Sequence, residues 1–385
     1  MKNKGSMISL LIAIIFLASV IGCQAATVTV DPGQRIQAVI DSAHPNDVVM
    51  VEKGIFNENL NITKKVTLVG IGKPLLDAGA AESAIIIHAE GVSIAGFELR
   101  NSKKAGIAVF SNNNSIRDNN VSGCNDGIRV ENSMNNSIAN NMIDDNTNGI
   151  SLVRSSKNLI GDNNISGNKV GESSDCGIYL AYSNNNTISD NQVTDNGDCS
   201  ICMLSSGKNM IVRNNISSNR WYGLSLSEFS NNNLIAENYV TNNKYGGIFL
   251  ENSRDNTIKD NRAKENGNGI YLSCNSNNNS AVGNFVTNNK NGIHLSFHNS
   301  NNTLSGNRAI NNEFGIYVTF SSGWNRIFNN SLIDNDYNAY DMGQKNKWDN
   351  GFVGNYYSDM GSQYYIPGGA GVDRHPLPPP SLDDS

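Results

Sequence analysis

A short motif, Gly-Ile or a close variant, returns through most of the chain at nearly constant spacing and limits the folds open to it. Successive copies lie 21, 22, 28, 23, 23, 24, 22, 23 and 23 residues apart, starting at Gly106, Gly127, Gly149, Gly177, Ser200, Gly223, Gly247, Gly269, Gly292 and Gly315. A fixed period of roughly 20–50 residues marks a repeat architecture. The chain is therefore predicted to stack one small structural unit many times.

Each period contains three short apolar bursts separated by polar corners. In one copy these are Ile178 with Leu180, then Ile188, then Val193. Because strand side chains alternate between faces, Ile178 and Leu180 point inward and Tyr179 points outward. Three short strands per turn, without a helical segment, predict a parallel β-helix. A leucine-rich repeat has a similar length, but its Leu-rich consensus and its helical segment are missing here.

Asparagine is concentrated in the repeat, where 59 of the 65 asparagines lie in residues 101–350. Asparagine tolerates positive φ at corners, and stacked coils about 4.8 Å apart let side-chain amides bond to one another as ladders. The regular apolar positions argue against the disordered, prion-like state that such a composition can also indicate. Two ladders are predicted. One comprises Asn119, Asn141, Asn163, Asn191, Asn214, Asn238, Asn261, Asn284, Asn307 and Asn330, and the other comprises Asn146, Asn168, Asn196, Asn219, Asn243, Asn266, Asn289, Asn312 and Asn335.

The first residues have the organisation of a secretion signal. Two lysines precede an apolar stretch from Met7 to Ile21, which is short for a membrane span. Residues 1–25 are therefore predicted to be a signal peptide that is cleaved after Ala25. The segment Val20–Cys23 also resembles a lipoprotein box, in which Cys23 would carry a lipid anchor. Both interpretations predict a secreted or cell-surface protein, with no transmembrane segment in the mature chain.

Both ends of the repeat depart from the pattern. In residues 31–43, apolar side chains recur at helical spacing, and this helix is predicted to cover the N-terminal end of the solenoid. The predicted segments are an N-terminal cap with irregular first coils (26–105), regular coils (106–340), a C-terminal cap (341–377) and a disordered Pro-rich tail (378–385). Short strands are expected at Val48–Val51, Val66–Val69 and Ala84–His88. The 28-residue step between Gly149 and Gly177 predicts an outward loop near Val170–Asp175.

Five cysteines follow the signal segment, and export would permit disulfides. Cys176 and Cys199 both stand directly before the Gly-Ile position of adjacent coils, which predicts a disulfide between them. Cys199 and Cys202 form a C-x-x-C, but no second pair and no adjacent helix support a metal or redox site.

The chain resembles the NosD-type β-helix proteins, which also occur as archaeal cell-surface proteins, over residues 27–377. The resemblance is carried by the start DPGQRIQAVIDSAHPNDVVMVEKGIF, the repeat, and the closing motifs WDNG, GNYYSD and DRHPL, which the family usually writes as WDNG, GNYWSD and DRYPL. It implies an all-β, single-stranded right-handed parallel β-helix, a pectate-lyase-like solenoid. Many relatives carry an acidic, Gly-rich stretch between the closing motifs. This chain has MGSQYYIPGG there, so no calcium loop is expected.

Composition excludes several classes of function. The net charge is −6 and the basic residues are scattered, so no nucleic-acid partner is expected. The family name implies copper delivery, but copper would need clustered His, Met or Cys. His294 and His298 share one coil and are interpreted as an incidental surface pair. No metal site and no cofactor is predicted.

Acidic residues recur just before the first ladder, at Asp162, Asp190, Glu237 and Asp260, with Arg213 interrupting the series. Paired acids can serve as general acid and base. However, a position beside a corner asparagine favours Asp for structural reasons, so no catalytic residue is assigned.

The outward position between the two core residues of the Gly-Ile burst carries aromatic rings in several coils. These are Tyr179, Phe249, Tyr271, His294 and Tyr317. Exposed rings on a flat sheet can stack on sugars, although rings also suit strands and stack on one another. The sequence predicts a continuous aromatic strip from Phe249 to Tyr317 that binds glycan.

The leading hypothesis is an exported cell-surface β-helix that binds or scaffolds an extracellular polysaccharide or envelope glycan without catalysis. One alternative is a lyase, hydrolase or epimerase of carbohydrates on the same fold. The other alternative, taken from the family name, is a periplasmic accessory protein for copper delivery.

Overall fold

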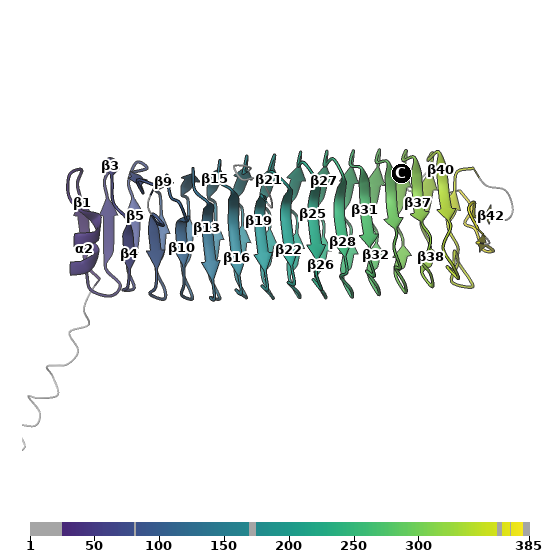
Figure 1. Ribbon diagram of the computed structural model, residues 1–385, viewed down its shortest axis with the longest axis horizontal. Helices are drawn as coiled ribbons and strands as arrows, with labels where there is room; N and C mark the ends of the chain where they lie inside the picture. Colours follow the sequence, from purple (N-terminus) through teal and green to yellow (C-terminus); the bar gives the residue numbers. More distant parts are fainter. Residues whose placement is uncertain (1–24, 81, 169–174, 360–363, 370, 380–385) are drawn as a thin grey trace, which may run out of the picture.

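The computed structural model describes residues 25–80, 82–168, 175–359, 364–369 and 371–379. They form a right-handed parallel β-helix whose coils stack into a rod, with helix α2 (Ile36–Ser42) at the N-terminal end (Figure 1). Three sheets of 14, 13 and 14 strands run along the rod. The predicted fold class is confirmed.

The sheets are named here A, B and C, and consecutive coils contribute one strand to each. Sheet A contains β1 (Thr27–Val30), β2 (Val48–Val51), β5 (Thr67–Gly70), β8 (Ser93–Ala95), β11 (Ser115–Arg117), β14 (Ser137–Ala139), β17 (Leu159–Gly161), β20 (Thr187–Ser189), β23 (Met210–Val212), β26 (Leu234–Ala236), β29 (Thr257–Lys259), β32 (Ser280–Val282), β35 (Thr303–Ser305) and β38 (Arg326–Phe328).

Sheet B contains β3 (Ile55–Phe56), β6 (Leu75–Asp77), β9 (Glu98–Arg100), β12 (Asn120–Ser122), β15 (Met142–Asp144), β18 (Asn164–Ser166), β21 (Gln192–Thr194), β24 (Asn215–Ser217), β27 (Tyr239–Thr241), β30 (Arg262–Lys264), β33 (Phe285–Thr287), β36 (Arg308–Ile310), β39 (Ser331–Ile333) and β41 (Tyr356–Tyr357).

Sheet C contains β4 (Leu60–Ile62), β7 (Ile85–Ile87), β10 (Ala105–Val109), β13 (Asp126–Glu131), β16 (Asn148–Val153), β19 (Cys176–Ala181), β22 (Cys199–Leu204), β25 (Tyr222–Ser227), β28 (Gly246–Glu251), β31 (Asn268–Ser273), β34 (Asn291–Leu295), β37 (Phe314–Val318) and β40 (Tyr337–Asp341). Strands β42 (Tyr364–Tyr365) and β43 (Val372–Asp373) pair antiparallel at the C-terminal end.

The core follows the apolar pattern of the repeat. The middle residue of each short strand in sheets A and B is buried, as at Ile188 and Val193, while the longer strands of sheet C bury two, as at Ile178 and Leu180. Stacking keeps each position in register with its counterpart in the next coil. Residues 170–174 of the loop predicted near Val170–Asp175 lie outside the described residues. The strands on either side of it remain in register.

Both predicted asparagine ladders are present, and their members are buried except Asn335, which is half-buried. In the first, Asn238 donates from its backbone N–H and its Nδ2 to Oδ1 of Asn261, at 3.0 and 2.9 Å. A third ladder, which the sequence analysis missed, precedes sheet A. It comprises Asn114, Asn136, Asn158, Asn186, Asn209, Asn233, Asn256, Asn279, Asn302, Asn325 and Asn346.

Positive φ occurs on the residue before a ladder asparagine rather than on the ladder residue itself. Asp162, Asp190, Glu237 and Asp260 have φ values of 55, 59, 56 and 53°. Tolerance of positive φ is therefore needed at the residue before the ladder asparagine, and side-chain hydrogen bonding is needed at the ladder asparagine itself. This placement explains why Asn, Asp and Gly are common directly before the ladder.

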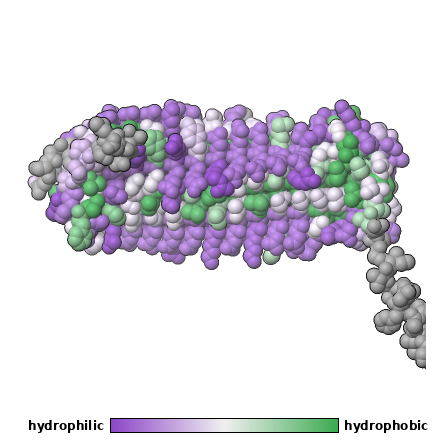
Figure 2. Space-filling model, turned by 180° about the vertical axis from the view of Figure 1, so that it is seen from behind, coloured by the Kyte–Doolittle hydropathy of each residue, from purple (hydrophilic) through white to green (hydrophobic). Residues whose placement is uncertain are grey.

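Both ends of the rod are covered, and the N-terminal end is covered by a helix, as the sequence predicts. Helix α2 buries Ile36 and Ile40, and β2 and β5 follow it in sheet A. At the other end, Trp348 and Tyr357 are buried and close the core. Among the described residues, no helix is long and apolar enough to cross a membrane. Seen from behind, hydrophilic side chains form rows along the rod with a narrow apolar band between them (Figure 2).

Candidate functional site

The outer face of sheet C carries two columns of side chains that differ from coil to coil. The first, called here the outer column, lies between the two core residues of each strand and comprises Ala108, Arg129, Ser151, Tyr179, Cys202, Ser225, Phe249, Tyr271, His294, Tyr317 and Tyr340. The second, called the pre-glycine column, lies three residues earlier and comprises Asp126, Asn148, Cys176, Cys199, Tyr222, Gly246, Asn268, Asn291, Phe314 and Tyr337.

The glycine of the repeat brings these two columns onto one face. A Cβ on Gly127 would lie 2.6 Å from Cγ2 of Ile143, so this position faces the core, as does the following residue Ile128. Two consecutive inward residues break the alternation of the strand, and the residue before the glycine then points outward. Outer-column side chains in several coils consequently contact the pre-glycine residue of the preceding coil. Ser151, for example, donates to Oδ1 of Asp126 at 2.7 Å.

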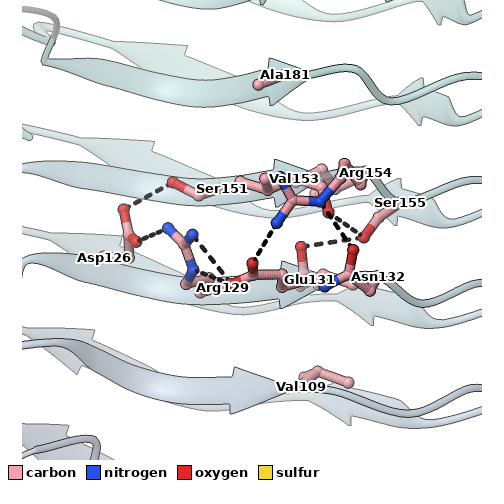
Figure 3. Close-up of polar contacts among 12 residues, drawn as sticks. Val109, Asp126, Arg129, Glu131, Asn132, Ser151, Val153, Arg154, Ser155 and Ala181 are labelled. Carbon is pink, nitrogen blue, oxygen red and sulfur yellow. Dashed lines mark hydrogen bonds and ion pairs between the residues drawn. The ribbon is translucent and has the colours of Figure 1, made fainter.

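A cluster of paired positive and negative groups, called here the compensated charge cluster, surrounds the outer-column residue Arg129 at β13 and the residue after β16 (Figure 3). Arg129 binds Asp126 at 3.0 Å and Glu131 at 3.1 Å, and Arg154 binds the other oxygen of Glu131 at 2.8 Å. Asp126 is buried, whereas the two arginines remain partly exposed. Each carboxylate is bridged by guanidinium, so the cluster offers fixed hydrogen-bonding groups rather than a free acid and base.

The disulfide joins Cys176 to Cys202, with Cα atoms 6.3 Å apart, so the predicted Cys176–Cys199 pairing is wrong. Cys176 and Cys199 are register partners, but the diagonal contact between the columns directs Cys176 toward the outer-column residue of the next coil. Cys199 is a buried free thiol, and burial raises its pKa to about 12. A thiol of this pKa is a poor nucleophile at neutral pH.

A shallow depression of about 260 Å³ lies where the outer column carries small side chains. Its lining includes Tyr179, Cys202, Ser225 and Ser227. Tyr179 and Phe249 are three register steps apart in the outer column, about 14 Å by coil spacing. This gap is wide enough to accept a sugar ring.

The predicted aromatic strip is continuous, and its rings stack on each other. Phe249, Tyr271, His294 and Tyr317 follow one another with centroids 5.1, 4.7 and 4.8 Å apart. Phe249 is only 9% exposed because Tyr222 covers its other face at 4.3 Å. Phe249 therefore points outward as predicted, but the expectation that its ring is exposed is wrong. Rings inside the stack present edges to solvent, whereas no ring covers Tyr179 within the described residues.

His294 is neutral in this stack. Burial lowers its pKa to about 4, and its Nδ1 lies 3.2 Å from Oδ1 of Asn268. Because that oxygen accepts, Nδ1 carries the proton. His298 is exposed at a corner with φ of 65°, so the two histidines do not form a ligand pair. Over the described ranges, no group of three or more His, Cys, Asp or Glu side chains is arranged to hold a metal ion.

Sequence reasoning missed the aromatic members of the pre-glycine column, Tyr222, Phe314 and Tyr337, which extend the stack. The available signal was an aromatic residue directly before the glycine position, as in Tyr222-Gly223. Regular alternation predicts that the side chain before the glycine points into the core, so these rings were not expected on the outer face. Among the recurrent acids, Asp190 is held by Arg213 at 2.8 Å through both oxygens, and Asp260 pairs with Lys259 at 3.3 Å.

Comparison with protein families matches the right-handed β-helix region over residues 78–215 and 164–309, which together span more than half of the chain. No curated protein matches the chain by sequence. The similar solved structures include the Dettilon tailspike protein, at 16% identity and a TM-score of 0.60. That match covers 71% of this chain and 62%, less than two thirds, of the tailspike.

Two enzymes of known structure are also similar. The mannuronan C-5 epimerase A-module of Azotobacter vinelandii is 14% identical with a TM-score of 0.55, and the match covers 81% of this chain and 92% of the module. The DFA-IIIase of Arthrobacter chlorophenolicus A6 is 16% identical with a TM-score of 0.54, covering 72% of this chain and 94% of the enzyme. At these identities the similarity shows the fold alone.

Proposed function

The chain belongs to the right-handed β-helix family, and we propose that it is an exported, cell-surface member that binds an extended extracellular glycan along sheet C without catalysis. The observation that carries this proposal is the depression beside Tyr179, where two coils that carry Cys202 and Ser225 in the outer column separate this ring from the stack that begins at Phe249. A sugar ring placed there would rest on Tyr179, since aromatic faces are the usual platforms for apolar ring surfaces.

The flanking columns suit the remainder of an extended ligand. On the N-terminal side, Arg129 and Arg154 are fixed by Glu131 and leave N–H groups for sugar hydroxyls. On the C-terminal side, the half-buried rings of Tyr271, His294 and Tyr317 offer a partly apolar surface about 10 Å long by coil spacing. The known proteins with this fold include one whose name identifies a polysaccharide, mannuronan, as its substrate, which supports a glycan ligand.

Two observations favour binding over catalysis. Hydrolysis of glycosides normally needs two carboxyl groups in different protonation states on either side of the bond, and Asp126 and Glu131 are both bridged by Arg129. The thiol nearest the depression, Cys199, is buried and protonated. Export rests on the predicted signal in residues 1–25.

The test is retention of the mature chain on a panel of neutral and acidic polysaccharides. Tyr179→Ala should weaken retention about fivefold, corresponding to about 1 kcal/mol for one lost stacking contact, and Ser225→Trp should abolish it by filling the depression. Tyr239→Ala is the matched control, because Tyr239 is an exposed tyrosine on sheet B. Equal retention of all three variants would refute the site. Release of unsaturated or reducing sugars by the wild type would favour the enzyme alternative.

A further inference from the structure

The C-terminal cap contains a cavity of about 610 Å³ that lies away from sheet C. It opens at the end of sheet A, and its lining includes Arg326, Lys347 and Arg374 together with Phe328 and Asp349. Arg326 begins β38, the last strand of sheet A, and Lys347 continues that sheet through an isolated parallel bridge. Arg374 comes from the closing segment after β43.

The positive charges of this cavity are uncompensated. Arg326 and Lys347 are register partners, and both are exposed on the outer face. Like charges directly opposite each other on a sheet are destabilising. Within the described part of the chain, neither side chain, nor that of Arg374, forms an ion pair with a carboxylate. Arg129, by contrast, is neutralised by two carboxylates.

The one carboxylate in the lining is already engaged. Oδ1 of Asp349 accepts from the backbone N–H of Gly351 at 2.8 Å and lies 3.5 Å from Nδ1 of His375. Its Oδ2 accepts from the backbone N–H of Arg374 at 3.2 Å. These contacts hold the closing segment against the WDNG turn, so Asp349 does not reach the three cations through its side chain.

Buried neighbours hold two of the cations in place. Trp348 is buried and donates from Nε1 to Oδ2 of Asp341 at 2.8 Å, which directs the adjacent Lys347 outward. Asp373 is fully buried and accepts from the backbone N–H of Asn355 at 2.6 Å, which fixes the adjacent Arg374. The backbone that carries these two cations, at Lys347 and Arg374, is therefore fixed by the cap.

We propose that this cavity binds a small oxyanion of at least two negative charges, either free or as the sulfate, phosphate or carboxylate groups of a saccharide. Guanidinium and ammonium groups that converge without a counter-ion are suited to such groups, because charge-assisted hydrogen bonds are about twice as strong as neutral ones. The volume is within the usual range for small-ligand sites. The site is separate from the depression of sheet C and does not depend on the proposed function.

The experiment is calorimetric titration of the full mature chain with three probes: sodium sulfate, inorganic phosphate and a galacturonate trisaccharide. The double variant Arg326→Gln/Lys347→Gln should weaken binding of the preferred probe at least tenfold, and Arg374→Gln should weaken it severalfold from a separate segment. The matched control is Lys157→Gln/Lys208→Gln, which removes the same charge from exposed corners and should leave binding within twofold. Circular dichroism checks that each variant is folded.

Saturable binding that the cap variants lose supports the site, and the tightest probe identifies the source of the oxyanion. Two results overturn the proposal. One is the absence of saturable binding of all three probes to the wild type. The other is binding that the cap variants and the control weaken equally, which would mean an adventitious ion only. Because none of these variants alters sheet C, retention on polysaccharides tests the proposed function separately.

Discussion

Replacing one ladder asparagine should destabilise the rod far more than replacing its neighbour in sequence. Asn214 is buried in the first ladder, and its Oδ1 accepts from the backbone N–H and from Nδ2 of Asn191, both at 3.0 Å. Its Nδ2 donates to the carbonyl oxygen of Ile188 at 2.9 Å and to Oδ1 of Asn238 at 3.0 Å. Asn215 points outward from sheet B and is exposed.

The magnitude follows from the groups left without partners. Asn214→Ala leaves the buried N–H of Asn191 without an acceptor and removes the amide donor from the carbonyl of Ile188. Each such group costs about 1–3 kcal/mol, so the free energy of unfolding should fall by about 2–6 kcal/mol. Asn215→Ala should change it by less than about 0.5 kcal/mol, as surface substitutions usually do.

The assay is urea unfolding of both variants and the wild type, followed by circular dichroism. Each coil of a solenoid contacts only its neighbours, so the defect can also divide the transition into two steps; the first step is then the one to compare. If Asn214→Ala and Asn215→Ala unfold within about 1 kcal/mol of each other, the ladder does not stabilise the fold in the way described here.

Three further predictions concern single sites. Cys202→Ser should lower the free energy of unfolding of the oxidised chain by about 3.5 kcal/mol, which is the chain-entropy value for the observed sequence separation of 26 residues. Cys199→Ala should have little effect. Equal effects of the two substitutions in urea unfolding would contradict the assigned pairing. Burial lowers the pKa of His294 to about 4. The stability that its neutral side chain contributes is therefore fully present above the unfolded pKa near 6.5 and is lost as the pH falls toward 4. The wild type should therefore lose up to about 3 kcal/mol relative to His294→Phe across that window, and parallel pH profiles would argue against a buried neutral imidazole. Trp348→Phe should cost about 1.5–3 kcal/mol, because Asp341 loses its 2.8 Å donor in the buried cap; an unchanged melting temperature would exclude this role for the hydrogen bond.

Features that repeat were predictable from the sequence. The period, the three strands per coil, the core positions such as Ile188 and two of the ladders each recur in every copy, so an error in one coil would have been visible against the others. The third ladder was missed because six of its eleven members lie in runs such as Asn184-Asn185-Asn186. Within such a run, the sequence alone does not distinguish Asn186, which turns inward, from its exposed or corner neighbours.

Contacts between the two columns of sheet C were not predictable from alternation alone. The inward glycine inserts one extra core residue, which shifts every preceding side chain to the opposite face. This shift accounts for both errors. It moved the disulfide partner of Cys176 from Cys199 to Cys202, and it brought Tyr222 against Phe249, so that a ring expected to be exposed is covered. Both errors therefore have one geometric cause.

The distribution of charge offers a way to separate structural surface groups from ligand-binding ones on this rod. Stacking at about 4.8 Å places outward residues of successive coils in contact. Two like charges at such neighbouring positions therefore lower the stability of the fold. Where the rod carries opposite charges, as at Asp126, Arg129 and Glu131, the cluster is satisfied internally. Where it places Arg326 opposite Lys347 beside a cavity, the fold alone gains nothing from the arrangement. A bound oxyanion would relieve that repulsion, so the cap should gain stability on adding the ligand while the compensated cluster should not respond.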